Sequence, residues 1–125
     1  MNPKKILVVD DEPSITSLLK LNLEKTGAYT VRVENEGAQA LPAARQFKPD
    51  LVLLDVMMPD MDGGDAAAQI RADPLLRDVP IVFLTAAVKK EELKGLEGMI
   101  GGFPYIAKPL NVKGVMSVIE KHLAK

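Results

Sequence analysis

The fold is decided by the stretch KILVVDDE at residues 5–12, where four aliphatic residues run directly into three acidic ones. The same arrangement recurs in PDLVLLD at residues 49–55, in which four aliphatic residues are followed by Asp55. Both runs are almost continuously apolar, which is typical of central strands in a parallel sheet that helices cover on both faces. Each run therefore predicts a buried strand with acidic side chains at its carboxyl end.

Further short apolar runs alternate with stretches of helical periodicity along the rest of the chain. This alternation predicts βαβ units, and therefore an α/β fold with a doubly wound, five-stranded parallel sheet, for which 2-1-3-4-5 is one common strand order. Periodicity alone does not choose that order. The predicted strands are Ile6–Val9, Tyr29–Val33, Leu51–Leu54, Ile81–Leu84 and Phe103–Ala107. The first predicted helix opens around Pro13 and ends at Gly27, and the others cover Gly37–Gln46, Gly64–Ala72, Lys89–Met99 and Val112–Leu123.

Local features refine these elements. The run Tyr29–Val33 alternates more than the others and is expected at an edge of the sheet. Pro42 should bend or delay the helix over Gly37–Gln46, because proline lacks an N–H and collides with the preceding turn. His122 has no second histidine or cysteine to accompany it and is expected on the surface, not as a phosphocarrier or metal ligand.

Composition limits the class of protein. A chain of 125 residues has the usual size of one compact domain, predicted here to span residues 1–125. Apolar residues make up 47% and the formal net charge is −1, so neither disorder nor direct nucleic-acid binding is expected. The absence of cysteine excludes thiolate sites and is compatible with a reducing compartment, so a cytoplasmic location is expected. No apolar run reaches the roughly 20 residues of a membrane helix, and no membrane association is expected.

Polar side chains follow the predicted strands where each strand ends: Asp10 and Asp11, Asp55, Thr85 and Lys108. Ligands of doubly wound sheets bind at these carboxyl ends. In the order 2-1-3-4-5 the first and third strands are neighbours, about 4.8 Å apart, so their carboxylates should converge. Three ionised carboxylates repel one another, and a hard divalent cation would relieve that repulsion.

Magnesium suits such a site because it prefers carboxylate and carbonyl oxygens and tolerates a phosphate as a further ligand. We expect its ligands to be Asp11, Asp55 and a backbone carbonyl just after Asp55. An aspartate with a pKa of about 3.9 is ionised at neutral pH and attacks phosphorus without a general base. The Lys108 ammonium and the Thr85 hydroxyl would then neutralise charge on the transferring phosphoryl oxygens.

These motifs and their order resemble the receiver domains of two-component response regulators, in particular the chemotaxis regulators. The resemblance covers essentially the whole chain and rests on KILVVDDE at 5–12, PDLVLLD at 49–55, MP at 58–59, DG at 62–63, TA at 85–86 and KP at 108–109. It implies a flavodoxin-like (βα)5 fold with the strand order 2-1-3-4-5. It also implies that Asp55 takes phosphate from the phosphohistidine of a sensor histidine kinase or phosphotransfer protein. In that reading Asp10, Asp11 and Asp55 hold Mg²⁺ together with the backbone carbonyl of Met57.

The resemblance assigns further roles near the fourth and fifth strands. It implies that Lys108 and Thr85 contact the phosphoryl group, and that the Lys108–Pro109 peptide bond is cis, which proline tolerates. Tyr105 stands where the family places an aromatic switch that turns inward when the Thr85 hydroxyl moves to the phosphate. The output face would comprise the fourth helix, fifth strand and fifth helix. Its partner would be an output protein or a fused effector domain, and homodimerisation is a further option.

The chain is expected to be a phosphoacceptor and not an enzyme acting on a separate substrate, although it would catalyse its own phosphorylation and slow dephosphorylation. The slow rate is inferred from Met57 and Ala87, two residues after Asp55 and Thr85 respectively. Both side chains are apolar, so neither can orient a water molecule for attack on the phosphoaspartate.

Other functions stay open at this point. A magnesium-dependent phosphohydrolase would use the same aspartyl nucleophile, but it needs an acid where Met57 stands and a substrate cap that a chain of this length does not provide. A nucleotide-binding domain lacks its glycine-rich fingerprint after the first strand. An unphosphorylated interaction scaffold is also compatible with the fold. Taken singly, Thr85 could be a helix cap, Lys108 a solvated surface lysine and Tyr105 ordinary packing.

Overall fold

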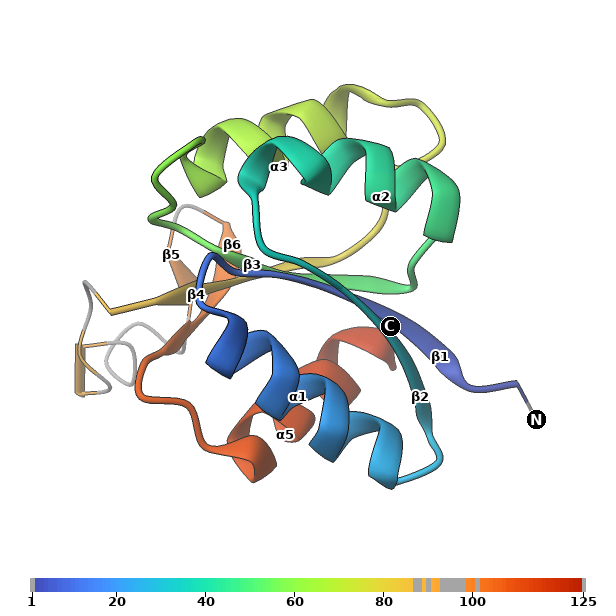
Figure 1. The fold of residues 1–125 in the computed structure, drawn as a ribbon, viewed down its shortest axis with the longest axis vertical. Helices are drawn as coiled ribbons and strands as arrows, with labels where there is room; N and C mark the ends of the chain where they lie inside the picture. Colours follow the sequence, from blue (N-terminus) through green and yellow to red (C-terminus); the bar gives the residue numbers. More distant parts are fainter. Residues whose placement is uncertain (1, 87–88, 90, 93–98, 101, 125) are drawn as a thin grey trace.

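The sheet at the centre of the structure has the order β2-β1-β3-β4-β6-β5 in the computed structural model (Figure 1). The structure describes residues 2–86, 89, 91–92, 99–100 and 102–124. The parallel strands are β1 (Lys4–Val9), β2 (Tyr29–Glu34), β3 (Leu51–Asp55), β4 (Ile81–Thr85) and β6 (Phe103–Ala107). Their order is the predicted 2-1-3-4-5, with β2 at an edge as expected.

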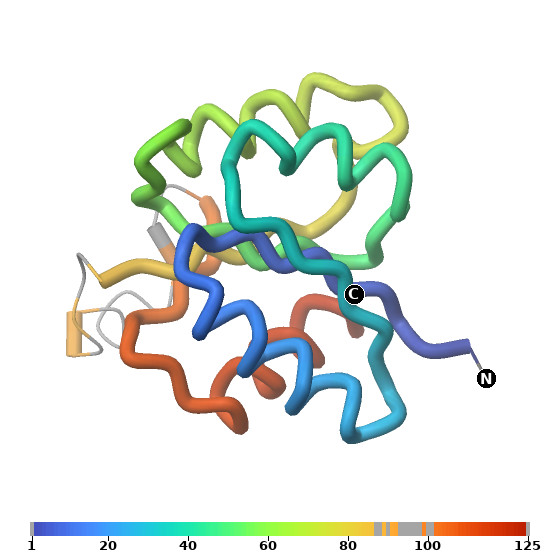
Figure 2. Tube along the Cα trace, in the orientation of Figure 1, coloured from blue at the N-terminus to red at the C-terminus, as the bar shows by residue number. Residues whose placement is uncertain are grey.

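Helices cover both faces of this sheet, as Figures 1 and 2 show. On one face lie α2 (Ala40–Phe47) and α3 (Gly63–Ala72), and on the other lie α1 (Pro13–Lys25) and α5 (Val112–Leu123). Because helices cover both faces, the side chains on both sides of a central strand are buried, and its sequence is apolar without alternation. In β3, Val52 and Leu54 pack with α2 and α3, whereas Leu51 and Leu53 pack with α1 and α5, and all four are fully buried. No helix in the described part of the chain is long and apolar enough to cross a membrane.

The second helix begins later than predicted. A 3-10 turn, η1 (Gly37–Gln39), comes first, and α2 starts at Ala40. Pro42 therefore lies in the first turn of α2, where the missing N–H removes no intrahelical hydrogen bond. The predicted delay by Pro42 is confirmed.

The region after β4 departs from the prediction. The helix predicted over Lys89–Met99 lies largely outside the described residues, although Glu91 and Glu92 are helical. Met99 belongs instead to β5 (Met99–Ile100), a short strand that pairs antiparallel with β6. The predicted five-stranded parallel sheet thus gains a two-residue antiparallel strand at its β6 edge.

His122 is buried, with 8% of its surface exposed, and the prediction of a surface residue is wrong. The reason is the spacing of α5, in which Val115, Ile119 and His122 follow one another at helical intervals and share the buried face. His122 lines a cavity of about 230 Å³ together with Arg71 and Phe103.

The free edge of β2 is covered by side chains of α1. Glu24 accepts a hydrogen bond from the backbone N–H of Val31 at 2.9 Å, and Lys20 donates one to the Val31 carbonyl at 2.7 Å. Lys20 and Glu24 also form an ion pair at 3.2 Å across one turn of the helix. The main chain of Val31 is therefore satisfied on the side that faces away from β1.

Candidate functional site

The sheet register brings the predicted site residues to one edge. Val9 of β1 is paired with Leu54 of β3, so the next residues along the two strands, Asp10 and Asp55, lie at the same height in the sheet. Asp55 is paired with Leu84, and Thr85 with Ala107, which places Thr85 and Lys108 at the ends of the next two strands. A parallel sheet with these neighbours collects the ends of β1, β3, β4 and β6 in one place.

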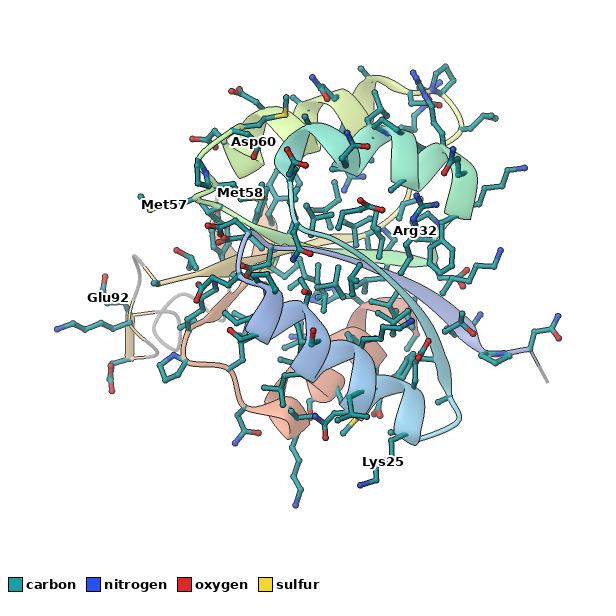
Figure 3. The ribbon with its side chains drawn as sticks, in the orientation of Figure 1. Lys25, Arg32, Met57, Met58, Asp60 and Glu92 are labelled. Carbon is teal, nitrogen blue, oxygen red and sulfur yellow. The ribbon has the colours of Figure 1, made fainter. Side chains whose placement is uncertain are left out.

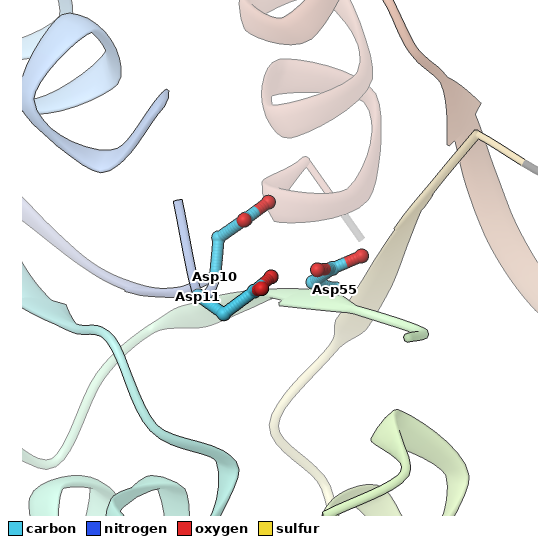
Figure 4. A group of neighbouring side chains, drawn as sticks. All are labelled: Asp10, Asp11 and Asp55. Atoms are coloured by element: carbon cyan, nitrogen blue, oxygen red, sulfur yellow. The ribbon is translucent and has the colours of Figure 1, made fainter. Parts of the chain in front are cut away.

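Three carboxylates converge there. One oxygen from each of Asp10, Asp11 and Asp55 lies within 4.8 Å of the others, and Figure 4 shows the three side chains gathered above the ends of β1 and β3. Asp10 is fully buried and Asp55 is 3% exposed, whereas Asp11 is half-buried. This arrangement of hard oxygen donors, open on the Asp11 side, fits a divalent cation.

Lys108 supplies the compensating positive charge. Its ammonium nitrogen lies 2.9 Å from Asp10 Oδ2 and 3.5 Å from Asp55 Oδ1. It also lies 3.3 Å from Glu12 Oε1. The backbone N–H of Lys108 donates to the Thr85 carbonyl at 2.7 Å, and the Lys108–Pro109 bond has the predicted cis geometry.

One ammonium does not balance the buried carboxylates. Burial raises the pKa of Asp55, the charge of Asp10 and a hydrogen bond with Asp11 raise it further, and Lys108 lowers it, for a net value of about 7. For Lys108, burial lowers the pKa, but the carboxylates of Asp10, Asp55 and Glu12 together outweigh burial, so the net pKa is raised. The site thus holds an excess of negative charge that a bound cation would relieve.

The connection between β3 and α3 closes over this edge. Its residues Val56, Met57, Met58, Pro59 and Asp62 line an open cleft of about 380 Å³, and Asp11, which follows β1, completes the lining. The connection returns tightly because Gly63 donates its N–H to the Val56 carbonyl at 2.8 Å, and a Cβ on Gly63 would overlap the carbonyl of Asp55. Asp62 then caps α3 by accepting from the Gly64 N–H at 2.7 Å.

Thr85 ends β4, and Tyr105 lies on the neighbouring strand β6, two residues before its end. Thr85 is 2% exposed at the end of β4. Tyr105 is half-buried, and its ring centroid lies 5.0 Å from that of Phe83, its partner in the sheet. The structure therefore gathers Asp10, Asp11 and Asp55, places Lys108 beside Asp10 and Asp55, and sets Thr85 at the adjoining strand end.

Sequence reasoning missed several supporting residues. Asn35 donates to the Asp10 carbonyl at 2.8 Å and lies 3.0 Å from Thr16 Oγ1, which fixes the end of β1. Glu12 pairs with Lys108, and Asp60 accepts two backbone hydrogen bonds. No local sequence pattern indicates these contacts, because each partner lies far along the chain.

A second cavity lies at the opposite end of the sheet. It measures about 580 Å³ and is lined by Arg45, Lys48, Pro49, Asp73, Leu75, Leu76 and Val79. These residues come from the end of α2 and from the segments that lead into β3 and β4. The larger hollow is therefore remote from the carboxylate cluster, and its size alone does not mark a site.

Comparison with protein families and curated proteins agrees with this geometry. The family model described as the response regulator receiver domain matches residues 6–120. The chain is 42% identical over 123 residues to the alkaline phosphatase synthesis transcriptional regulatory protein PhoP of Bacillus subtilis (strain 168), covering 98% of this chain and 49% of that protein. It is 40% identical to the DNA-binding response regulator MtrA of Mycolicibacterium smegmatis, with coverages of 98% and 51%. The chain spans about half the length of these curated relatives.

Solved structures show the same fold. The receiver domain of the sensor histidine kinase PA1611 from Pseudomonas aeruginosa PAO1, solved with a magnesium ion coordinated in its active site cleft, has a TM-score of 0.82 and 28% identity, over 99% of this chain and 100% of that one. The BeF3-activated N-terminal receiver domain of Klebsiella pneumoniae RstA has a TM-score of 0.79 and 32% identity, with coverages of 98% and 100%.

Proposed function

Since the chain belongs to the family of response regulator receiver domains, whose role is to accept a phosphoryl group, we propose that the acceptor in this chain is Asp55. The observation that carries this assignment is the position of Asp55. Its buried carboxylate lies at the end of a central strand, beside Asp10 and Asp11 and 3.5 Å from the Lys108 ammonium. Among the carboxylates of this cluster, Asp55 alone lies on β3, at the foot of the cleft-forming connection.

The same cluster is proposed to hold Mg²⁺ through Asp10, Asp11 and Asp55, with the backbone carbonyl of Met57. The fit rests on three carboxylates whose oxygens gather within 4.8 Å and on the raised pKa of Asp55, which burial and the charge of Asp10 cause. A magnesium ion bound there would add positive charge beside the oxygens of an incoming phosphoryl group. The Pseudomonas aeruginosa receiver domain, similar in fold, was solved with such an ion in its cleft.

The phosphoryl transfer follows from the residues themselves. An oxygen of ionised Asp55 attacks phosphorus, the bond between phosphorus and the histidine nitrogen of the donor breaks, and the donor imidazole keeps the electron pair. The product is an acyl phosphate on Asp55 and a histidine that takes up a proton from water. Lys108, held by the Thr85 carbonyl, lies close enough to pair with a phosphoryl oxygen. Its ammonium compensates charge that builds up on the transferring group.

Thr85 and Tyr105 are proposed as the switch that reports the phosphoryl group. Thr85 would turn its hydroxyl to a phosphoryl oxygen, and Tyr105 would occupy the space this releases. The output face would include β6 and α5, together with the predicted fourth helix. The donor would be a sensor histidine kinase or phosphotransfer protein, and the output a partner protein or an effector domain. Support comes from curated relatives that are named as DNA-binding or transcriptional regulators. This chain spans about half of the length of these relatives.

Incubation with Mg²⁺ and acetyl phosphate, followed by intact mass measurement, tests the proposal. We expect one phosphoryl group per chain, and none in Asp55→Asn, which keeps the shape of the side chain but removes the nucleophilic carboxylate. Asp65→Asn, an exposed carboxylate on α3, is the matched control and should label like the wild type. Catalytic turnover of phosphoesters without a lasting adduct would instead indicate a hydrolase, and neither adduct nor Mg²⁺ binding would indicate a scaffold.

A further inference from the structure

The connection between β3 and α3 is tied to a distant segment by one side chain, Asp60. Its Oδ1 accepts a hydrogen bond from the Gly37 N–H at 3.0 Å, and its Oδ2 accepts one from the Ala38 N–H at 2.9 Å. Both amides belong to η1, which follows β2. Figure 3 shows Asp60, Met58 and Met57 along the connection that crosses from β3 towards α3. One carboxylate thus joins two connections that are more than 20 residues apart in the sequence.

The tie is matched by close packing. Gly37 is buried, and a Cβ at this position would lie 2.9 Å from Met61 Cβ, 3.0 Å from the Met61 carbonyl and 3.0 Å from Met58 Cε. Such distances are closer than carbon atoms tolerate, so only glycine lets η1 approach this far. The two connections therefore lie in direct contact on both sides of the Asp60 hydrogen bonds.

The hydrogen bonds are of the charge-assisted kind. The first N–H groups of a helical turn have no partner within that turn, and Asp60 satisfies two of them from outside. These bonds from Ala38 and Gly37 lower the pKa of Asp60, so the carboxylate is ionised at neutral pH. An ionised acceptor makes shorter and stronger hydrogen bonds than a neutral one.

The tie reaches the phosphoacceptor through a short and restricted stretch of chain. Met57 donates its N–H to Asp55 Oδ1 at 3.4 Å, so its main chain already lies against the acceptor. Met58 is buried, and Pro59 fixes one backbone torsion directly before Asp60. Few free rotations separate the anchored carboxylate from the main chain of Met57.

We propose that Asp60 is a positioning residue for the phosphoacceptor site: by anchoring the β3–α3 connection on η1, it holds the main chain of Met57 in place beside Asp55. The inference rests on the proposed function, because Met57 is proposed there as the source of the backbone ligand for Mg²⁺. Linkage makes the effect reciprocal, so a cation that orders the connection also strengthens the hold of Asp60 on Gly37 and Ala38.

Titration calorimetry of Mg²⁺ binding, at constant ionic strength, tests the anchoring. Asp60→Ala removes both acceptor oxygens and is expected to raise the Kd for Mg²⁺ about tenfold. Such an increase is at the lower end of what is found when a residue that orients a metal ligand is replaced. Asp60→Asn loses the same charge but keeps one carbonyl acceptor, and its Kd should lie between those of Asp60→Ala and the wild type. Asp65→Ala removes an exposed carboxylate that makes no side-chain hydrogen bond within the described residues, and its Kd should stay within about twofold of the wild type.

Amide hydrogen exchange on the metal-free protein gives a second readout that does not depend on Mg²⁺. Gly37 and Ala38 should exchange faster in Asp60→Ala than in the wild type, while amides of β1 and β3 stay unchanged. In the wild type, Mg²⁺ should slow exchange at Gly37 and Ala38, and in Asp60→Ala this protection should be lost.

The outcomes separate the alternatives. Equal Kd values for Asp60→Ala and Asp60→Asn would show that only the charge matters and would overturn the positioning role. A wild-type Kd in Asp60→Ala would overturn it too. Failure of the wild type to bind Mg²⁺ and to take up a phosphoryl group would instead overturn the proposed function, and the positioning role with it.

Discussion

Two carboxylates at opposite ends of the sheet have pKa values shifted in opposite directions. Asp55, at the carboxyl ends of the strands, has a pKa raised to about 7, because burial and the charge of Asp10 disfavour its ionised form. Asp73, at the other end, has a lowered pKa, because Arg45 donates a hydrogen bond to it at 2.9 Å and the Leu75 N–H donates another. The side chains are similarly covered, 5% and 11% exposed. Burial and a neighbouring carboxylate thus raise the pKa of one group, whereas hydrogen-bond donors lower the pKa of the other.

The largest expected effect is on stability at alkaline pH without metal. The folded state favours protonated Asp55, so this contribution is complete below a pH of about 3.8 and is lost as the pH rises through about 7. Asp55→Asn avoids the loss and should exceed the wild type at pH 8 by up to about 4 kcal/mol, at 1.36 kcal/mol per pKa unit. Urea unfolding in EDTA at pH 5 and pH 8 measures the difference. If the free energy of unfolding of Asp55→Asn, relative to the wild type, does not rise between pH 5 and pH 8, the raised pKa of Asp55 is contradicted.

The next largest effect is on the rate of phosphoryl uptake, and it distinguishes Lys108, beside Asp55, from Arg45, beside Asp73. Lys108→Met keeps the length of the side chain but removes the ammonium beside Asp55, and we expect phosphoryl uptake to slow by about a hundredfold, as when a transition-state donor is lost. Arg45→Met breaks the ion pair with Asp73 and should leave the rate unchanged. Time courses with acetyl phosphate, read by intact mass, compare the two variants. Equal rates for both would remove the special role of Lys108.

A smaller effect is expected on the lifetime of the phosphorylated state. Met57 is 70% exposed beside the cleft, and its thioether does not orient water. Ala87, the other apolar position named from the sequence, lies outside the described residues. Met57→Asn combined with Ala87→Glu should speed loss of the phosphoryl group about tenfold, by supplying polar groups that position a water molecule. Little or no acceleration in a dephosphorylation time course would count against slow decay as a property of these two residues.

The smallest effect belongs to Asp73. Its lowered pKa means that its contribution to stability is present above the unfolded pKa of about 3.9 and is lost as the pH falls through the folded value. The Arg45 side chain is 60% exposed, and such pairs contribute little. Asp73→Asn should therefore lower Tm by a few degrees at most at pH 7 and by less at pH 3. Thermal unfolding at both pH values checks this, and a loss that grows towards pH 3 would reverse the sign of the argument.

The parts of the site predicted from sequence are those that strand ends determine. Asp10, Asp55, Thr85 and Lys108 each follow a recognisable apolar run, and the sheet order alone brings such positions together. The structure bears out the gathering of Asp10 and Asp55 with Lys108, while the role of Asp55 as acceptor stays a prediction.

The parts that were missed depend on contacts between remote segments. Asn35 and Asp10 are 25 residues apart, and Asp60 and Gly37 are 23 apart. Both contacts join a side chain to the backbone of another loop, so no periodicity or composition encodes them. The burial of His122 is different, because its spacing from Val115 and Ile119 was visible in the sequence and indicated the inner face of α5.

The cover over the β2 edge has a consequence for solution behaviour. Glu24 and Lys20 occupy the main-chain donor and acceptor of Val31, which an incoming strand would need for pairing. At the other edge the sheet ends in β5, a strand of two residues. Short or blocked edges discourage strand addition between copies. Pairing with a strand of another chain is therefore disfavoured at these edges, and we expect a protein that binds this domain to use side-chain surfaces instead of extending the sheet.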